Sequence, residues 1–162
     1  MASSVTSYLP AFEGLLPKWL LLVSVISVAN SIQAYATLTY TQRVYNNVTA
    51  PSPPKSAPSR MLKQSSTSSP ETPSLVTPLS ARTFGTWTFL SSIIRLYAAY
   101  HIDEPLIYQL ALWTYGVAWA HFMSEWWVFG TTRWGKGLAG PVFVSSGSLM
   151  WMWLQWGFYV KG

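Results

Sequence analysis

The chain has 162 residues, of which half are hydrophobic, only 9% are charged and ten are tryptophan, and its net charge is +5. A soluble domain usually carries about 25% charged residues, so this composition favours a single domain embedded in lipid. The scattered basic residues argue against nucleic-acid binding, and the absence of cysteine excludes disulfides, zinc–thiolate sites and thiol nucleophiles.

The N-terminal part predicts a short tail followed by a membrane-spanning helix. Residues 1–17 are weakly polar, and a long apolar run then covers residues 18–40. The run is long enough to cross a bilayer and has no basic start of a cleaved signal peptide, so we predict a first transmembrane helix. Asn30 and Gln33 lie inside it. Because amides in lipid form hydrogen bonds with other helices, both are candidate helix-packing or partner contacts.

A polar segment separates this helix from the next. Residues 41–82 form the first loop, and residues 46–80 within it are dominated by proline and serine and contain no aromatic residue. Such a composition buries too little apolar surface to offset the entropy lost on ordering. We therefore predict a disordered loop over residues 46–80.

Two further spans follow, joined by a short acidic turn. Residues 83–100 predict a second transmembrane helix that contains Arg95, and residues 106–129 predict a third, preceded by Pro105. Proline suits the first position of a helix, where its missing N–H would have no partner anyway. A fourth helix is predicted over residues 138–159, with Pro141 in its first turn. The expected fold is thus all-α, an integral membrane protein with four transmembrane helices.

The basic residues of the loops predict the orientation of these helices. Cytosolic loops are enriched in lysine and arginine. The first and third loops lie on the same side and together hold seven basic residues: Arg43, Lys55, Arg60, Lys63, Arg82, Arg133 and Lys136. We therefore expect both loops in the cytosol, with the N-terminal tail, the C-terminus and the acidic turn in the lumen.

The third span carries the most unusual polar residues. His121 and Glu125 are four residues apart, which places them on one face of a helix. Polar groups in lipid are costly and need a reason. The two form half a metal site at most, because the only other histidine, His101, lies at the opposite membrane face. A polar clamp between helices is the favoured interpretation, and we predict no catalytic, cofactor-binding or metal-binding residue.

Arg95 and Glu125 invite a direct ion pair, which their depths oppose. With a rise of 1.5 Å per residue, the two side chains are separated by about 10–20 Å along the membrane normal. We expect Arg95 to extend toward the lumen and the turn at Asp103 and Glu104. Glu125 is expected to meet Arg82, Arg133 or hydroxyl groups at the cytosolic rim.

Three stretches resemble the ergosterol biosynthetic protein 28 family. They are ANSIQAY at residues 29–35, ARTFGTWTFLSSIIR at residues 81–95 and LWTYGVAWAHFMSEWWVFGT at residues 112–131. The resemblance covers the first three spans, is weak in the fourth and is absent from the proline- and serine-rich loop. It offers no established catalytic residues to carry over.

The resemblance implies a non-enzymatic scaffold of the endoplasmic reticulum membrane that acts in sterol synthesis. The implied partners are the sterol C-4 methyl oxidase, the decarboxylating 3β-hydroxysteroid dehydrogenase and the 3-keto sterol reductase. Assembly of the chain into homo-oligomers is a further option. Two alternatives remain: an enzyme that uses His121 and Glu125 as acid and base on a sterol, and a sterol-binding or transport protein. A transporter would place Arg95 and Glu125 along its path, but a four-span chain without internal repeats would have to oligomerise to enclose one.

Overall fold

The computed structural model describes residues 8–45 and 75–160, and every regular element in these residues is helical. The elements are α2 (Leu16–Ala36), α3 (Thr39–Val44), α4 (Pro78–Tyr100), α5 (Pro105–Trp127), α6 (Lys136–Leu154) and α7 (Trp156–Tyr159). The predicted all-α class is confirmed. The loop predicted to be disordered falls mostly on residues 46–74, which lie outside the described residues.

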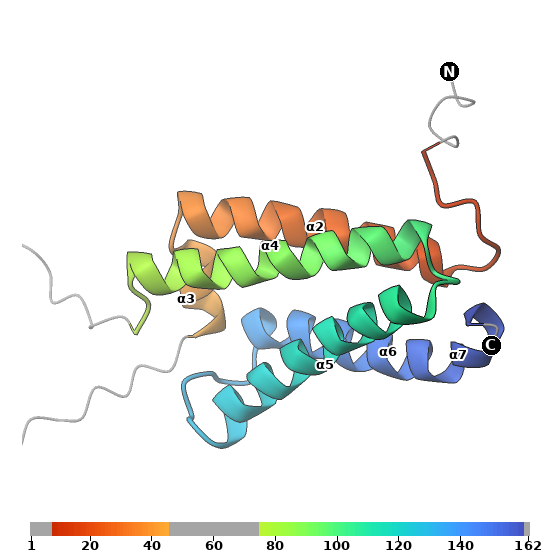
Figure 1. Ribbon diagram of the computed structural model, residues 1–162. Helices are drawn as coiled ribbons and strands as arrows, with labels where there is room; N and C mark the ends of the chain where they lie inside the picture. Colours follow the sequence, from red (N-terminus) through yellow and green to blue (C-terminus); the bar gives the residue numbers. More distant parts are fainter. Residues whose placement is uncertain (1–7, 46–74, 161–162) are drawn as a thin grey trace, which may run out of the picture.

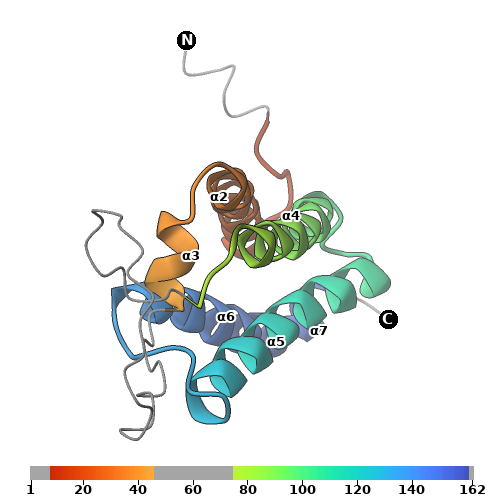
Figure 2. The ribbon, with the colours of Figure 1, turned by 90° about the vertical axis from the view of Figure 1, so that its left-hand side faces the viewer.

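The long helices form two antiparallel pairs stacked on each other. In Figure 1, α2 and α4 lie side by side above α5 and α6. Figure 2 shows α3 leaving the upper pair and reaching down toward the start of α6. The N-terminal segment and α7 meet at one end of the molecule, where the Tyr159 hydroxyl donates to the Glu13 carbonyl at 3.0 Å. The first and third loops therefore leave from the opposite end.

Small and hydroxylated residues allow α2 and α4 to pack closely. Ser24, Ser27, Ser31 and Ala34 recur every three or four residues, so they form one buried stripe along α2. The Ser24 hydroxyl donates to the Ser92 carbonyl at 2.8 Å, and the Ser31 hydroxyl donates to the Gly85 carbonyl at 2.6 Å. We call this interface the α2/α4 seam. Small residues with hydroxyls that bond across the interface are typical of helix pairs in lipid.

Local sequence explains where α4 and α5 begin. The Ser80 amide donates to the Thr77 hydroxyl, and the Ser80 hydroxyl accepts from the Thr77 amide, which together form a capping box. Pro78 occupies the first turn of α4. The predicted disorder was therefore wrong for residues 78–80, which are helical. Pro105 begins α5, as predicted, because a helix start needs no donor there.

All four long helices differ from their predicted bounds. The second begins at Pro78 instead of residue 83, and the third covers Pro105–Trp127 instead of residues 106–129. The helix expected over residues 18–40 begins at Leu16 and stops at Ala36, because Thr37 is extended and its hydroxyl donates to the Gln33 carbonyl at 3.3 Å. α3 then starts a new direction. α6 begins at Lys136, so Pro141 lies inside the helix instead of in its first turn. α6 ends at Leu154, and α7 carries residues 156–159 separately.

Two apolar clusters lie between the pairs. One lies toward the termini and includes Leu20, Ile102, Tyr108 and Met152. The Tyr108 hydroxyl inside it donates to the Met152 carbonyl at 2.7 Å. The other cluster lies toward the loops, around Phe84, Phe122, Leu138 and Val142. A direct bond from the Trp19 indole to the Ser148 hydroxyl, at 2.9 Å, ties α2 to α6.

The outer surface of the long helices is strongly apolar. Trp113, Trp127 and Trp153 are each about 70% exposed, and many aliphatic side chains on α2 and α4 are also exposed. Patches of this kind mark surfaces that meet lipid or a partner. Among the described helices, α2 alone has the length and mean hydropathy of a membrane span. α4, α5 and α6 do not meet both criteria, so the four-span arrangement stays a prediction.

Candidate functional site

The side chains of His121 and Glu125 share one face of α5, as their spacing predicted. His121 Nδ1 and Glu125 Oε1 are 4.0 Å apart, at the outer limit of an ion pair. Both side chains are mostly shielded, with 32% and 20% of their surface exposed. A contact of this length is an electrostatic attraction, which orients the imidazole without fixing it by a short hydrogen bond.

Tyr45, just after α3, completes a three-residue polar chain. Its hydroxyl lies 2.6 Å from His121 Nε2, and its ring stands edge-on to the imidazole. With Nδ1 protonated toward Glu125, Nε2 accepts from the tyrosine hydroxyl. Burial raises the pKa of Tyr45 above its usual value, with a smaller contribution from the charge of Glu125, so this hydroxyl keeps its proton. This contact joins the end of α3 to α5, and the role of His121 as a polar clamp stays a prediction.

Glu125 also holds the turn that follows its helix. The Thr131 hydroxyl donates to Glu125 Oε2, and the Thr131 amide donates to the Glu125 carbonyl at 2.9 Å. Gly130 allows this return because its φ of +62° lies in the left-handed region. Of the predicted partners for Glu125, the structure provides a hydroxyl at the loop end of the molecule.

The Tyr45–His121–Glu125 chain faces a pocket of about 310 Å³, which we call the rim pocket. Its other walls come from Val76, Trp87 and neighbouring residues of α4. An imidazole between a carboxylate and a hydroxyl can relay a proton to or from a group bound beside it. Among the described residues, no three side chains of histidine, cysteine, aspartate or glutamate come together as a metal site would require.

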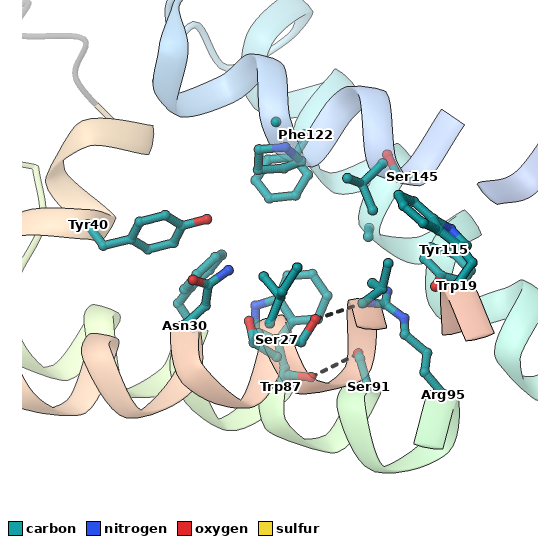
Figure 3. Close-up of a pocket in the computed structure, with 18 residues that line it drawn as sticks. Trp19, Ser27, Asn30, Tyr40, Trp87, Ser91, Arg95, Tyr115, Phe122 and Ser145 are labelled. Carbon is teal, nitrogen blue, oxygen red and sulfur yellow. Dashed lines mark hydrogen bonds between the residues drawn. The ribbon is translucent and has the colours of Figure 1, made fainter. Parts of the chain in front are cut away.

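Arg95 takes a different position from the one predicted. It was expected to extend toward the acidic turn, but its side chain is only 7% exposed and points between the helix pairs (Figure 3). Its Nε donates to the Thr114 hydroxyl at 3.0 Å, Nη2 to the Thr114 carbonyl at 3.3 Å and Nη1 to the Ser27 hydroxyl at 3.4 Å. The guanidinium also stacks over Tyr115, 4.1 Å from the ring centre. These neutral partners hold the cation in place, so the prediction of an extended arginine was wrong.

The two amides of α2 separate in the structure. Asn30 is half-buried and faces the interior between the helix pairs, near Tyr40 (Figure 3). Gln33 is exposed on the outside of α2. Gln33 is therefore not packed between helices of this chain, and its role as a contact to a partner stays a prediction.

Sequence reasoning missed several residues that build these polar groups. Tyr45 fell within the predicted loop, and no periodicity pointed to it. Thr114 and Tyr115 lie in a run of apolar and aromatic residues. Nothing in that run distinguishes the threonine whose hydroxyl accepts a hydrogen bond from Arg95. Ser24, Ser27 and Ser31 did carry a signal, because small polar residues at helical spacing mark a close helix interface.

Comparison with known proteins gives one consistent family. The model of the family described as "Erg28 like protein" matches residues 16–150. The chain is 46% identical over 148 residues to ergosterol biosynthetic protein 28 of Candida albicans, covering 91% of this chain and 90% of that protein. It is 43% identical to the protein of the same name from Saccharomyces cerevisiae, covering 91% and 84%.

The similarity extends to animals. The human ergosterol biosynthetic protein 28 homolog is 33% identical over 142 residues, which cover 87% of this chain and 84% of that protein. No solved structure matches the chain.

Proposed function

This chain belongs to the Erg28-like family, and from that membership we propose that it acts in ergosterol biosynthesis as a non-catalytic membrane scaffold. It tethers the sterol C-4 methyl oxidase, the decarboxylating 3β-hydroxysteroid dehydrogenase and the 3-keto sterol reductase at the endoplasmic reticulum. The observation that carries the proposal is similarity over nearly the whole chain to relatives named for ergosterol biosynthesis.

The distribution of polar and apolar groups supports a multi-pass membrane location. Large apolar side chains face outward on all four long helices, while the seam between α2 and α4 is lined by serine, glycine and alanine. This arrangement suits lipid, where association of helices depends on close packing and hydrogen bonds instead of on apolar burial. The same outward surface offers extended contact area for other membrane proteins.

A tether works by raising the effective concentration of its partners, without a reaction of its own. Loss of the chain should therefore slow C-4 demethylation without blocking it. In a deletion strain, C-4-methylated or carboxylated intermediates should accumulate while some end-product sterol persists. A covalent fusion of the methyl oxidase to the dehydrogenase should restore part of the flux, because the fusion supplies the same proximity.

The measurement is a sterol profile of the deletion strain with and without the fusion, with the two unfused enzymes expressed at matched levels as the control. Affinity purification of the full chain in mild detergent should also recover the three enzymes. A complete block that an active fusion leaves unrelieved would contradict the tether and favour catalysis or substrate delivery.

The Tyr45–His121–Glu125 chain beside the rim pocket supports one alternative, an enzyme that acts on a sterol. Both test variants keep the shape of the side chain. Tyr45→Phe removes the hydroxyl that donates a proton, and Glu125→Gln removes the negative charge. Tyr100→Phe is the matched control, because that hydroxyl donates to the Tyr8 carbonyl at the other end of the molecule. A scaffold should tolerate all three changes. Loss of sterol conversion in the first two variants, with the enzyme complex intact, would establish the catalytic alternative.

A further inference from the structure

A cavity of about 260 Å³ lies between the α2/α4 pair and the α5/α6 pair, and we call it the inter-pair cavity (Figure 3). Its walls are mainly apolar or aromatic, and they include Trp19, Val23, Phe84, Trp87, Ala118 and Phe122. Ligand sites usually have volumes of about 300–1,000 Å³. This cavity is slightly smaller, so it can hold one end of a lipid but not the whole molecule. The walls suit an apolar body.

Arg95 supplies a positive charge at one end of this cavity. In Figure 3, Arg95 and Tyr115 lie at one end, with Asn30 and Tyr40 at the other. A guanidinium has five N–H donors, and the described residues accept from three of those on Arg95. No carboxylate of the described chain lies within 4.0 Å of it.

A cation that is 93% shielded from solvent and lacks a counter-charge is costly, since a buried charge is ordinarily paired. A planar guanidinium with unused donors is also well suited to bind a carboxylate, to which it can donate two parallel hydrogen bonds. Anionic groups of higher charge, such as phosphates, are usually bound by clusters of arginines. Among the residues that the structure describes, Arg95 is the one basic residue that lines the inter-pair cavity.

We propose that the inter-pair cavity binds the carboxylate end of a lipid that has an apolar body and a single acid group. The carboxylate pairs with the free donors of Arg95, the first part of the body lies against Trp87 and Phe122, and the remainder extends beyond the cavity. The body is either a linear acyl chain or a fused-ring system, which share this recognition chemistry. The proposal rests on cavity and charge alone and does not depend on the scaffold function.

The test measures binding of radiolabelled palmitate to the purified full chain in detergent micelles. We expect saturable binding at one site and displacement by unlabelled palmitate. The neutral analogue 1-hexadecanol should compete roughly 10- to 100-fold less well, because a hydrogen bond to a charged group contributes more than one to a neutral group. Equal competition by the alcohol would overturn the proposal, as would the absence of saturable binding.

Two pairs of variants locate the site. Arg95→Gln should weaken palmitate binding roughly tenfold or more, while Arg82→Gln, an exposed arginine on the same helix, should leave it unchanged. Ala118→Leu adds volume inside the cavity, and Ala120→Leu makes the same change on the exposed side of α5. Only the first of these should reduce binding. Equal affinity in the two alanine variants would place the lipid elsewhere and overturn the proposal.

The cavity variants and the neutral analogue keep the test informative if Arg95→Gln fails to fold. Competition by lithocholate, a fused-ring acid, against that by palmitate then identifies the body that fits, and either result supports the site. Stronger displacement by dioleoyl phosphatidate than by both carboxylates would overturn the assignment of a carboxylate and indicate a phospholipid headgroup.

Discussion

The close contact between α3 and α6 requires a glycine at position 137, so a larger residue there should destabilise the protein. A methyl group on Gly137, in the first turn of α6, would collide with the backbone carbonyl of Arg43 in α3. A backbone oxygen cannot rotate aside as a side chain can. Gly147 lies on the same helix, and a methyl group there meets nothing within 4 Å. Gly137→Ala and Gly147→Ala are therefore the same chemical change in opposite surroundings.

The expected effects have opposite signs. Replacing glycine by alanine in a helix stabilises a protein by about 0.4–1 kcal/mol where the conformation and the space allow it. Gly147→Ala should gain this amount. Overpacking at a tight contact costs about 1–3 kcal/mol, so Gly137→Ala should lower the free energy of unfolding by a net of about 1–2 kcal/mol.

Thermal unfolding of both variants in one detergent, followed by tryptophan fluorescence, gives the comparison. A second readout follows from the geometry, because α3 carries Tyr45 to His121. Displacement of α3 in Gly137→Ala should alter the nitrogen NMR signals of His121, whereas Gly147→Ala should leave them unchanged. Equal stabilisation of the two variants would refute the close packing of α3 on α6.

Three further outcomes are expected. Ser31→Ala removes the hydroxyl that donates to the Gly85 carbonyl at 2.6 Å, so the free energy of unfolding in a denaturant titration should fall by about 0.5–1.5 kcal/mol; no change would argue against the seam. In intact microsomes, an impermeant maleimide should label Lys136→Cys and spare Asp103→Cys, and the reverse pattern would invert the predicted orientation. Tyr108→Phe leaves a buried α6 carbonyl without its donor, so the same titration should show a loss of about 1–3 kcal/mol; an unchanged midpoint would contradict that bond.

The sequence predicted those features that depend on local pattern. Apolar runs of helical length gave the all-α class, Pro105 gave the start of α5, and the four-residue spacing put His121 and Glu125 on one face. Each of these follows from a short stretch of chain and elementary helix geometry. The bend at Thr37 was missed because an apolar run continues through it, and only the backbone shows that the helix stops.

Contacts between distant segments could not be predicted in the same way. Arg95 was assigned an outward path by its depth in one helix, whereas its position is set by Ser27 on α2 and by Thr114 and Tyr115 on α5. Tyr45 reaches His121 across 76 residues of sequence. No periodicity within one helix records which neighbour a side chain will meet after packing.

The α2/α4 seam has a consequence for how this chain can vary between lineages. Its two helices hold each other by direct contacts along their length, and the covalent connection between them leaves from one end of the molecule (Figure 1). Closing a longer connection costs only about 0.6 kcal/mol for each doubling of its length. Insertions and deletions between α3 and α4 are thus nearly neutral for the fold. At Gly85, by contrast, even an added methyl group would lie 3.2 Å from the Ser31 backbone carbonyl oxygen, so a bulkier side chain would collide with it. Selection should therefore tolerate drift in the length of the connection and act most strongly on the few small side chains of the seam.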